Sequence, residues 1–236
     1  MTLTNNDDLS SEENKYLNLS EDFFQKYISK GITIGLGSGR TVENVVRNFD
    51  RLEYKNTLEF IVTSLQIKLV TESAGLKVVA PSENTNIDVV LDGADQIDSN
   101  FNMIKGGGGA LMNEKILIHS SKKVVIVAQD YKFVDKLNMA VPIEVSQFGR
   151  TFVMNKLKKI GGLPQIRLLN RGYPYITENG NIIYDTLLPT YHNLKEIERE
   201  VKNIPGVIEV GLFTNPANSY YKIKNEFEFK HLSPKR

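Results

Sequence analysis

The sequence of 236 residues contains no cysteine, which excludes disulfides, thiol nucleophiles and thiolate zinc sites. It has only three histidines, and His119, His192 and His231 are widely separated along the chain. A histidine metal cluster and a histidine-based catalytic triad are therefore not expected. The groups that remain available for chemistry are carboxylates, lysines and backbone amides.

The chain also lacks a hydrophobic run long enough to cross a bilayer, and residues 1–20 are too polar to form a secretory signal. It has almost no excess charge, because 29 lysines and arginines oppose 28 aspartates and glutamates. Such a balance gives no overall field that would attract nucleic acid or an anionic membrane. We therefore predict a cytoplasmic protein with no nucleic-acid or membrane partner, which recognises any anionic ligand locally.

What is present is the composition of an ordinary folded protein, with 41% hydrophobic and 24% charged residues. Segments with strand character alternate with helical segments, and the segment IDVVLDGAD has the apolar run expected of a strand buried on both faces. The predicted strands are 32–36, 59–64, 76–80, 87–95 and 122–130. This alternation predicts an α/β fold with an open, mostly parallel, Rossmann-like sheet that carries helices on both faces.

Helix signals accompany these strands. Apolar residues recur with helical spacing over 42–49, directly after the first predicted strand. Ser10 followed by Glu13 resembles a capping box. Ser20, with acidic residues after it, is predicted to begin a helix that runs to Tyr27.

From Val141 the pattern changes to strand, helix, strand, strand, helix, strand. This order is that of a ferredoxin-like α+β unit, which we interpret as an insertion. The predicted domains are a Rossmann-like catalytic domain of 1–140 and 212–236 and a ferredoxin-like domain of 141–211. The extended segment 220–229 could return to the first sheet, form a loose edge strand or contact a partner.

Polar clusters follow several of the predicted strands. They are 37–41, Thr63 with Ser64, Asp92 to Asp95, and Asp130 to Lys132. Ligands of an open parallel sheet bind beyond the carboxyl ends of its strands. Residues from distant parts of the sequence are therefore expected at one edge of the sheet.

The loop GLGSGRT is the strongest candidate for binding an anion. Gly37 and Gly39 allow a ligand to approach the backbone, the next helix points free N–H groups at the loop, and hydroxyls come from Ser38 and Thr41. Arg40 stands where a dinucleotide-binding motif needs its last glycine, and no P-loop lysine follows. A tight turn without a ligand explains the motif equally well.

Asp92 and Asp95 follow a predicted buried strand, so their carboxylates should emerge at the same edge. A carboxylate pair can bind magnesium, but neither an EF-hand loop nor a Walker lysine accompanies it. The alternative is that these aspartates bond to their own backbone in a turn, which suffices for Asp98.

The glycines at 106–109 add nothing to a core and are costly in conformational entropy. Their amides could stabilise a developing oxyanion, with Lys105 beside them as a cation. A flexible linker is the alternative, although a linker rarely lies between a buried strand and a helix.

Glu114 lies in the predicted helix ALMNEKILIHS, three residues after Leu111 and four before Ile118, and so shares their inward face. A carboxylate that is partly desolvated there should have a raised pKa and accept a proton near neutral pH. The commoner alternative is a surface glutamate in the first turn of a helix.

Together these motifs resemble the ribose-5-phosphate isomerase A family over nearly the whole chain. In order they are GLGSGRT, TSLQ, DGADQID, MIKGGGGALMNEKI, VAQDYKFVD, VPIEVSQFG, ITENGN and IPGVIEVGLF. The DGAD block and the KGGGGAL block with its following glutamate and lysine are the most specific part of the resemblance.

The resemblance implies an aldose-ketose isomerase that interconverts D-ribose 5-phosphate and D-ribulose 5-phosphate through an enediolate in the non-oxidative pentose phosphate pathway. It implies no metal, no organic cofactor, and a homodimer or homotetramer. Glu114 would move the proton between C1 and C2, while Asp92 and Asp95 would bind sugar hydroxyls and assist ring opening. Lys105 and the glycine amides would stabilise the enediolate oxygen. Substrate or phosphate contacts are expected from Gly37, Ser38, Gly39, Arg40, Thr41, Gly106, Gly107, Gly108 and Lys132.

The sequence departs from the family pattern in three places. The loop is more often GTGST, so Ser38 and Arg40 alter it, and Arg40 could itself reach a phosphate. Gln96 replaces the usual glutamate of DGADE and removes a charge beside the aspartates. The first helix lacks a frequent lysine pair, for which Lys15 could substitute.

Two other functions remain open on a similar scaffold. An isomerase-deaminase for amino sugar phosphates should need a histidine near the site and would release ammonia from glucosamine 6-phosphate. A non-catalytic regulator would bind a sugar phosphate but would have no need of Glu114.

Overall fold

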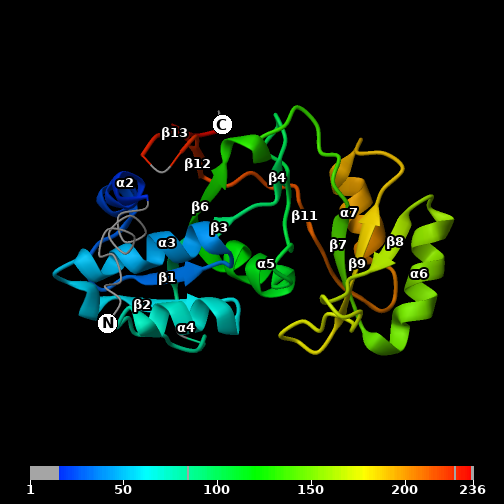
Figure 1. Ribbon diagram of the computed structural model, residues 1–236, viewed down its shortest axis with the longest axis horizontal. Helices are drawn as coiled ribbons and strands as arrows, with labels where there is room; N and C mark the ends of the chain where they lie inside the picture. Colours follow the sequence, from blue (N-terminus) through cyan, green and yellow to red (C-terminus); the bar gives the residue numbers. More distant parts are fainter. Residues whose placement is uncertain (1–15, 84, 226, 235–236) are drawn as a thin grey trace, which may run out of the picture. The chain divides into compact units, whose positions relative to one another are not determined.

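The computed structural model describes residues 16–83, 85–225 and 227–234 (Figure 1). Contacts group the chain into two compact units. Among the described residues, the first comprises those up to Gly93 with Ser120–Asp130 and Ser219–Ser233, and the second comprises Ala94–His119, Tyr131–Asn218 and Pro234. The predicted domain bounds at 140/141 and 211/212 stay a prediction. The capping-box residues Ser10 and Glu13, and also Lys15, lie outside the described residues.

The first predicted helix is present as α2 (Leu17–Tyr27), but it begins before Ser20. The Ser20 hydroxyl is buried, donates to the Tyr16 carbonyl at 2.9 Å and accepts a hydrogen bond from Asn48 Nδ2 at 2.9 Å. The expectation that Ser20 begins the helix is therefore wrong. Its hydroxyl joins α2 to α3 (Arg40–Asn48) instead of capping a helix end.

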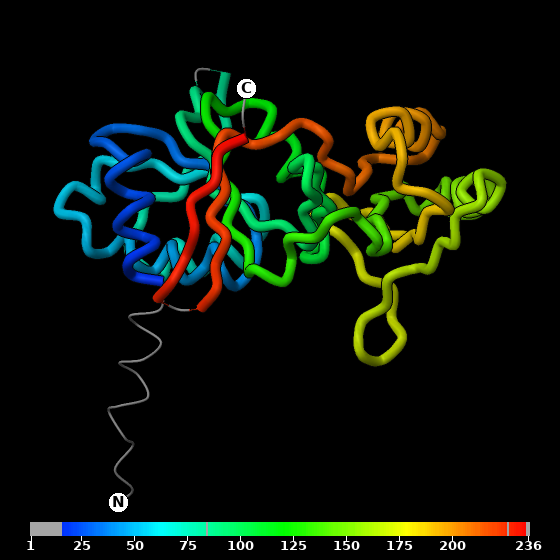
Figure 2. Tube along the Cα trace, turned by 90° about the horizontal axis from the view of Figure 1, so that it is seen from above, coloured from blue at the N-terminus to red at the C-terminus, as the bar shows by residue number. Residues whose placement is uncertain are grey.

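The first unit is built on a six-stranded sheet with the order β13-β12-β6-β3-β1-β2. The strands are β1 (Thr33–Leu36), β2 (Glu59–Val62), β3 (Ile87–Gly93), β6 (Ser121–Gln129), β12 (Ser219–Ile223) and β13 (Phe229–Leu232). Every neighbouring pair is parallel except β12 with β13. Figure 2 shows β12 and β13, in orange to red, side by side. The mostly parallel sheet is confirmed. Of the alternatives left open for the 220–229 segment, the structure shows the return to this sheet, where β12 pairs with β6.

One predicted strand of this sheet is wrong. The segment 76–80 forms only an isolated bridge between Val78 and Phe60, through the bonds Phe60 N–H to Lys77 O and Val79 N–H to Phe60 O. It follows α4 (Leu65–Ser73), which Ser64 caps by accepting a hydrogen bond from the Ile67 N–H. The apolar pattern of a short edge segment does not distinguish a bridge from a strand.

Aromatic side chains fill the core between the helices and the sheet of the first unit. Phe49 and Phe60 meet edge to face with ring centroids 5.1 Å apart, and Phe24 from α2 lies 4.5 Å from Phe49. Phe23, Phe49 and Phe60 are fully buried, and the burial of each such side chain stabilises the fold by about 1.5–3 kcal/mol.

Short 3₁₀ helices connect elements at Phe49–Arg51, Lys55–Thr57, Asp130–Lys132 and Gln147–Gly149.

The second unit contains a four-stranded antiparallel sheet with the order β10-β7-β9-β8. Its elements are β7 (Val141–Val145), α6 (Arg150–Lys159), β8 (Leu163–Ile166), β9 (Ile182–Leu187), α7 (Leu194–Lys202) and β10 (Val207–Val210). Val153 and Leu157 of α6 share one core with Leu194 and Val201 of α7 and with alternate residues of β7. Both helices therefore cover one face of the sheet, and the predicted ferredoxin-like unit is confirmed.

A glycine ends the last strand of this sheet. Gly211 separates β10 from β11 (Leu212–Phe213), and β11 joins a three-stranded sheet with β5 (Met103–Ile104) and β4 (Gln96–Ile97). A Cβ at Gly211 would lie 2.4 Å from the Lys105 carbonyl oxygen. Only glycine permits this approach, which allows the chain to pass from one sheet to the other.

α5 (Leu111–Ser120) follows the glycine run and carries Glu114 in its first turn.

No helix within the described part of the chain is long and apolar enough to span a membrane. The cytoplasmic location stays a prediction from the sequence.

His231 on β13 lies in a polar cluster with α2. Its Nε2 meets the Ser219 hydroxyl and also the Tyr27 hydroxyl, the latter at 3.2 Å. Burial lowers the pKa of His231 below its usual value, and Lys26 lowers it further, while Asp22 acts in the opposite direction. The neutral imidazole is therefore the form that this cluster favours.

We predict that His231 makes the stability of the first unit depend on pH. Because its pKa in the folded protein lies below the usual 6.5, the unfolded chain takes up this proton first as the pH falls. The stabilisation is thus complete at pH values above 6.5. It is lost as the pH falls below 6.5 toward the pKa that His231 has in the folded protein. Melting curves between about pH 7.5 and about pH 5.5 should show a larger loss of Tm in the wild type than in His231→Gln. Equal losses would contradict the prediction.

Candidate active site

The loop after β1 brings hydroxyl groups together at one edge of the six-stranded sheet. Ser38 Oγ lies 2.9 Å from Thr63 Oγ1 and 3.1 Å from Ser64 Oγ, both of which follow β2. Gly39 precedes α3 with a φ of 110°, a backbone conformation that favours glycine. The predicted meeting of the GSGRT loop with Thr63 and Ser64 is confirmed, and the hydroxyls lie next to the N-terminus of α3.

Asp92 is packed directly against this loop. Its side chain is fully buried, and its Oδ1 accepts a hydrogen bond from the Gly93 N–H at 2.7 Å. A Cβ added to Gly37 would lie 1.7 Å from the same oxygen. The missing side chain of Gly37 therefore provides the space that the Asp92 carboxylate occupies.

Arg40 and Thr41 form the first residues of α3. The Arg40 side chain is exposed, and no ion pair of Arg40 occurs among the residues that the structure describes. Thr41 is partly exposed. Their contacts with a ligand stay a prediction.

In the second unit, Asp95 is bonded to the glycine run. Its Oδ2 accepts the Gly107 N–H at 2.7 Å, and a Cβ at Gly107 would lie 2.6 Å from Asp95 Oδ1. The Gly109 N–H donates to the Gly106 carbonyl at 2.9 Å. Within the described residues, the N–H groups of Gly106 and Gly108 make no hydrogen bond. One of the predicted oxyanion amides is therefore committed to Asp95, and the amides of Gly106 and Gly108 are not.

Lys105 and Glu114 form a buried ion pair. Lys105 Nζ lies 3.0 Å from Glu114 Oε2, and the two side chains are 2% and 4% exposed. Lys105 follows β5, and its ammonium lies 5.4 Å from the centre of the Phe213 ring. The burial that the sequence predicted for Glu114 is confirmed, and its raised pKa stays a prediction.

Lys115, the next residue of α5, has a structural role that the sequence did not reveal. Its ammonium donates to Glu198 at 2.7 Å, to Glu209 at 2.9 Å, and to the carbonyls of Val210 and Leu212 at 2.7 and 2.9 Å. Burial would raise the pKa of Glu209, but Lys115, the Val210 N–H and Lys202 together outweigh burial and hold that pKa below its usual range. α5 is thus anchored to β10 and β11.

Lys132 lies in the 3₁₀ helix Asp130–Lys132, and its Nζ donates to the Ala94 carbonyl at 2.7 Å. This bond holds the backbone at Ala94, the residue before Asp95. The predicted contact of Lys132 with a ligand stays a prediction.

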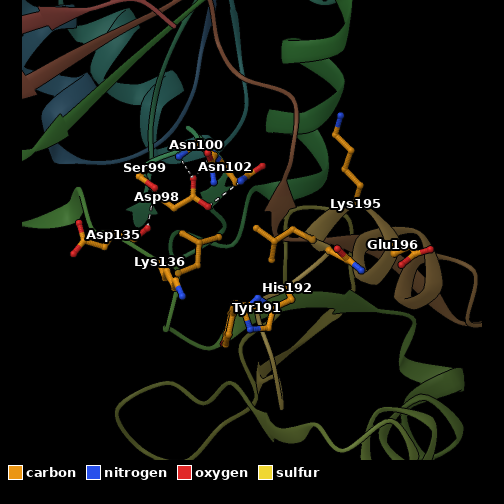
Figure 3. A pocket seen from close by; sticks show the side chains of 13 residues that line it. Asp98, Ser99, Asn100, Asn102, Asp135, Lys136, Tyr191, His192, Lys195 and Glu196 are labelled. Atoms are coloured by element: carbon orange, nitrogen blue, oxygen red, sulfur yellow. Dashed lines mark hydrogen bonds between the residues drawn. The ribbon is translucent and has the colours of Figure 1, made fainter. Parts of the chain in front are cut away.

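Asp98 is confirmed as a turn residue. Its carboxylate accepts the N–H groups of Asn100 and Asn102 at 2.9 and 2.8 Å and the Asn102 side-chain amide at 2.8 Å, as Figure 3 shows. Gln96, the departure from the family pattern, bonds to Asn138 through both ends of its amide. Among the described residues neither side chain makes a hydrogen bond to Asp95, and both bond to the backbone or side chains of the neighbouring loops.

The sequence and structure match one family of enzymes. The family model for ribose 5-phosphate isomerase A (phosphoriboisomerase A) matches residues 59–226. The ribose-5-phosphate isomerase A of Korarchaeum cryptofilum is 39% identical over 188 residues, which cover 78% of this chain and 83% of that protein. The solved ribose 5-phosphate isomerase of Plasmodium falciparum has a TM-score of 0.86 and 32% identity and covers 96% of this chain and 99% of its own. A D-ribose-5-phosphate isomerase solved in complex with phospho-erythronic acid has a TM-score of 0.86 and 29% identity, covering 95% of this chain and 99% of its own.

We predict that Gly37→Ala destabilises the protein by displacing Asp92. The added Cβ would lie 1.7 Å from Asp92 Oδ1, so the carboxylate must move. The free energy of unfolding, measured by urea titration, should fall by about 1–3 kcal/mol, which is typical of overpacking.

The matched control is Gly93→Ala, because a Cβ at Gly93 comes no closer than 3.6 Å to any atom outside its chain neighbours. Its free energy of unfolding should change by less than about 1 kcal/mol. If Gly37→Ala proved as stable as the control, contact with Gly37 would not be what holds Asp92.

Proposed function

Because the chain belongs to the ribose 5-phosphate isomerase A family and interconverts ribose 5-phosphate and ribulose 5-phosphate, we propose that Glu114 is the base of this reaction. The observation that carries the proposal is its buried pairing with Lys105, 3.0 Å away. An aldose-ketose isomerase needs one base that accepts a proton from carbon and a cation or donor for the oxygen that becomes negative. The two alternatives from the sequence, an isomerase-deaminase and a non-catalytic regulator, are not the function of this family.

The proposed steps balance within the substrate. Glu114 removes the proton from C2 of the open-chain aldose, the C–H electron pair forms the C1–C2 double bond, and O1 takes the negative charge of the enediolate. Lys105 and the Gly106 and Gly108 amides stabilise that charge. Glu114 then returns its proton to C1, and the O2 hydroxyl proton passes to O1, which gives the ketose.

Asp92 and Asp95 are proposed to hold sugar hydroxyls and to assist ring opening. Each carboxylate packs against the backbone of a glycine, Asp92 against Gly37 and Asp95 against Gly107. A side chain on either glycine would occupy the place of the carboxylate. Fixed acceptors orient a hydroxyl without the entropy loss that a mobile side chain would incur.

The phosphate is proposed to bind at the loop that precedes α3. The hydroxyl of Ser38, the exposed cation of Arg40 and the free amides of the helix N-terminus are groups that recognise phosphate. Gly39, Thr41 and Lys132 are further proposed contacts. A family member has been solved with phospho-erythronic acid, a phosphorylated sugar acid, which supports a sugar phosphate as the ligand.

We further propose that the chain forms a homodimer or homotetramer. Large apolar side chains are exposed on and around β8, and such clusters commonly mark contacts between proteins. They are Leu163, Ile166, Leu168, Leu169, Tyr173, Ile176 and Leu187.

Replacing two of these side chains tests the assembly. Leu168→Lys with Leu169→Lys, which are 51% and 53% exposed in the single chain, should shift sedimentation toward the monomer without loss of secondary structure. A wild type that sediments as a monomer at micromolar concentration would remove the proposal, as would an unchanged assembly in the double variant.

We predict that Glu114→Gln lowers kcat for ribose 5-phosphate by about 100-fold or more while KM changes little, because the size is kept and the base is lost. The measurement is a coupled assay in the presence of a metal chelator, together with exchange of the C2 proton in heavy water. Glu200→Gln, the same change at an exposed position of α7, is the control and should retain activity. Near-normal turnover in Glu114→Gln would remove Glu114 from this role.

A further inference from the structure

The carbonyl groups of the glycine run are held by two side chains from the segment between β8 and β9. Arg167 Nη1 donates to the Gly106 carbonyl at 2.7 Å and to the Gly107 carbonyl at 3.0 Å. The Tyr175 hydroxyl donates to the Gly108 carbonyl at 2.9 Å. Three consecutive glycine carbonyls are thus each bound by a side chain more than 50 residues away in sequence.

Arg167 is itself fixed in position. Its Nε donates to Asp185 Oδ2 on β9 at 2.9 Å, and its Nη2 donates to Asp185 Oδ1, which makes a two-point contact. The guanidinium also lies 5.9 Å from the centre of the Tyr175 ring. A planar guanidinium can hold a carboxylate on one side and offer its remaining donors on another, which an ammonium cannot do.

Tyr175 is positioned as closely as Arg167. A Cβ at Gly109 would lie 2.3 Å from the Tyr175 hydroxyl oxygen, so the ring packs against the bare backbone there. Burial raises the pKa of Tyr175, with Glu178 and Glu144 acting in the same direction and Arg167 against it. The hydroxyl therefore keeps the proton that it donates to Gly108.

Fixing these carbonyls also fixes the amides. In a trans peptide, the carbonyl of one residue and the N–H of the next point in opposite directions. The carbonyls of Gly106, Gly107 and Gly108 therefore determine the directions of the N–H groups of Gly107, Gly108 and Gly109. The Gly107 N–H reaches Asp95 and the Gly109 N–H closes a turn, whereas the Gly108 N–H has no partner within the described residues.

Glycine has little conformational preference of its own, so a run of glycines does not hold its amides in one direction. Stabilisation of a developing charge depends on donors that are oriented before the reaction. The glycines have no side chains that could hold their backbone in one conformation. Groups from other parts of the fold must therefore orient their amides.

We propose that Arg167 and Tyr175 are positioning residues that orient the glycine run, so that the Gly108 N–H faces the developing oxyanion and the Gly107 N–H holds Asp95. The proposal rests on the function proposed for this loop. Neither side chain acts on the substrate itself, and Asp185 serves by holding Arg167.

The first experiment observes the loop in the absence of substrate, so that it does not depend on the proposed reaction. Amide hydrogen exchange and ¹⁵N chemical shifts of Gly106 to Gly109 are measured in Arg167→Met and in the wild type. We expect at least about 10-fold faster exchange in the variant, because the carbonyls lose their donors. The control is Arg171→Met, since Arg171 is an exposed arginine in the same connection between β8 and β9 and should leave these amides unchanged.

The second experiment measures kinetics with ribose 5-phosphate. Arg167→Met should lower kcat by about 100-fold, as expected when an oxyanion donor is lost, with less than about threefold change in KM. Tyr175→Phe should lower kcat by about 10-fold. Arg167→Lys should recover part of the loss, because one ammonium can still reach a carbonyl, and Arg171→Met should behave as the wild type.

Each outcome decides something. Unchanged amides in Arg167→Met would overturn the proposal, and so would altered amides with kcat within threefold of the wild type. A rise in KM equal to the fall in kcat/KM would assign Arg167 to binding and overturn the positioning role. If Arg167→Met does not fold, Tyr175→Phe and Arg167→Lys carry the same tests. Absence of isomerisation in the wild type would instead refute the proposed function, while the exchange result would still stand.

Discussion

The buried ion pair between Lys105 and Glu114 is the interaction on which the second unit's arrangement depends. Both side chains are almost fully buried, and a buried charge that loses its partner destabilises a protein by about 3–5 kcal/mol. The elements that carry them must therefore keep their positions. β5 is held between β4 and β11, and α5 is held by Lys115 on the carbonyls that flank Gly211. The glycine run joins these two fixed elements, so its ends are set before any ligand binds.

The fold was largely predictable because strand and helix patterns depend on local periodicity. The alternation over 32–130 and the β-α-β-β-α-β order after Val141 both led to the correct architecture. The expectations that failed depended on contacts that are not local. Ser20 bonds to Asn48 instead of capping a helix, and the segment 76–80 forms one bridge instead of a strand. The two-residue strands β4, β5 and β11 are too short to leave a periodic pattern.

The candidate site divides in the same way. The burial of Glu114 followed from its spacing to Leu111 and Ile118, and the turn role of Asp98 followed from the residues after it. Arg167 and Lys115 gave no such signal. Each looks like an ordinary charged residue in the sequence, because the partners, Gly106 and Glu198, lie 61 and 83 positions away. Two of the glycine contacts, Gly37 with Asp92 and Gly211 with Lys105, depend on close backbone approach, which no spacing rule indicates.

The position of β12 has a consequence for how the protein is made. β12 pairs with β6, although the whole ferredoxin-like sheet lies between them in the chain. During synthesis on the ribosome, β7 to β10 emerge before β12 does, so that sheet can complete its hydrogen bonds while one side of β6 is still unpaired. An apolar strand with an open edge pairs readily with other chains. The nascent protein is therefore most prone to aggregation in the interval before residues 219–223 emerge, and the speed of translation across this interval should influence the yield of folded enzyme.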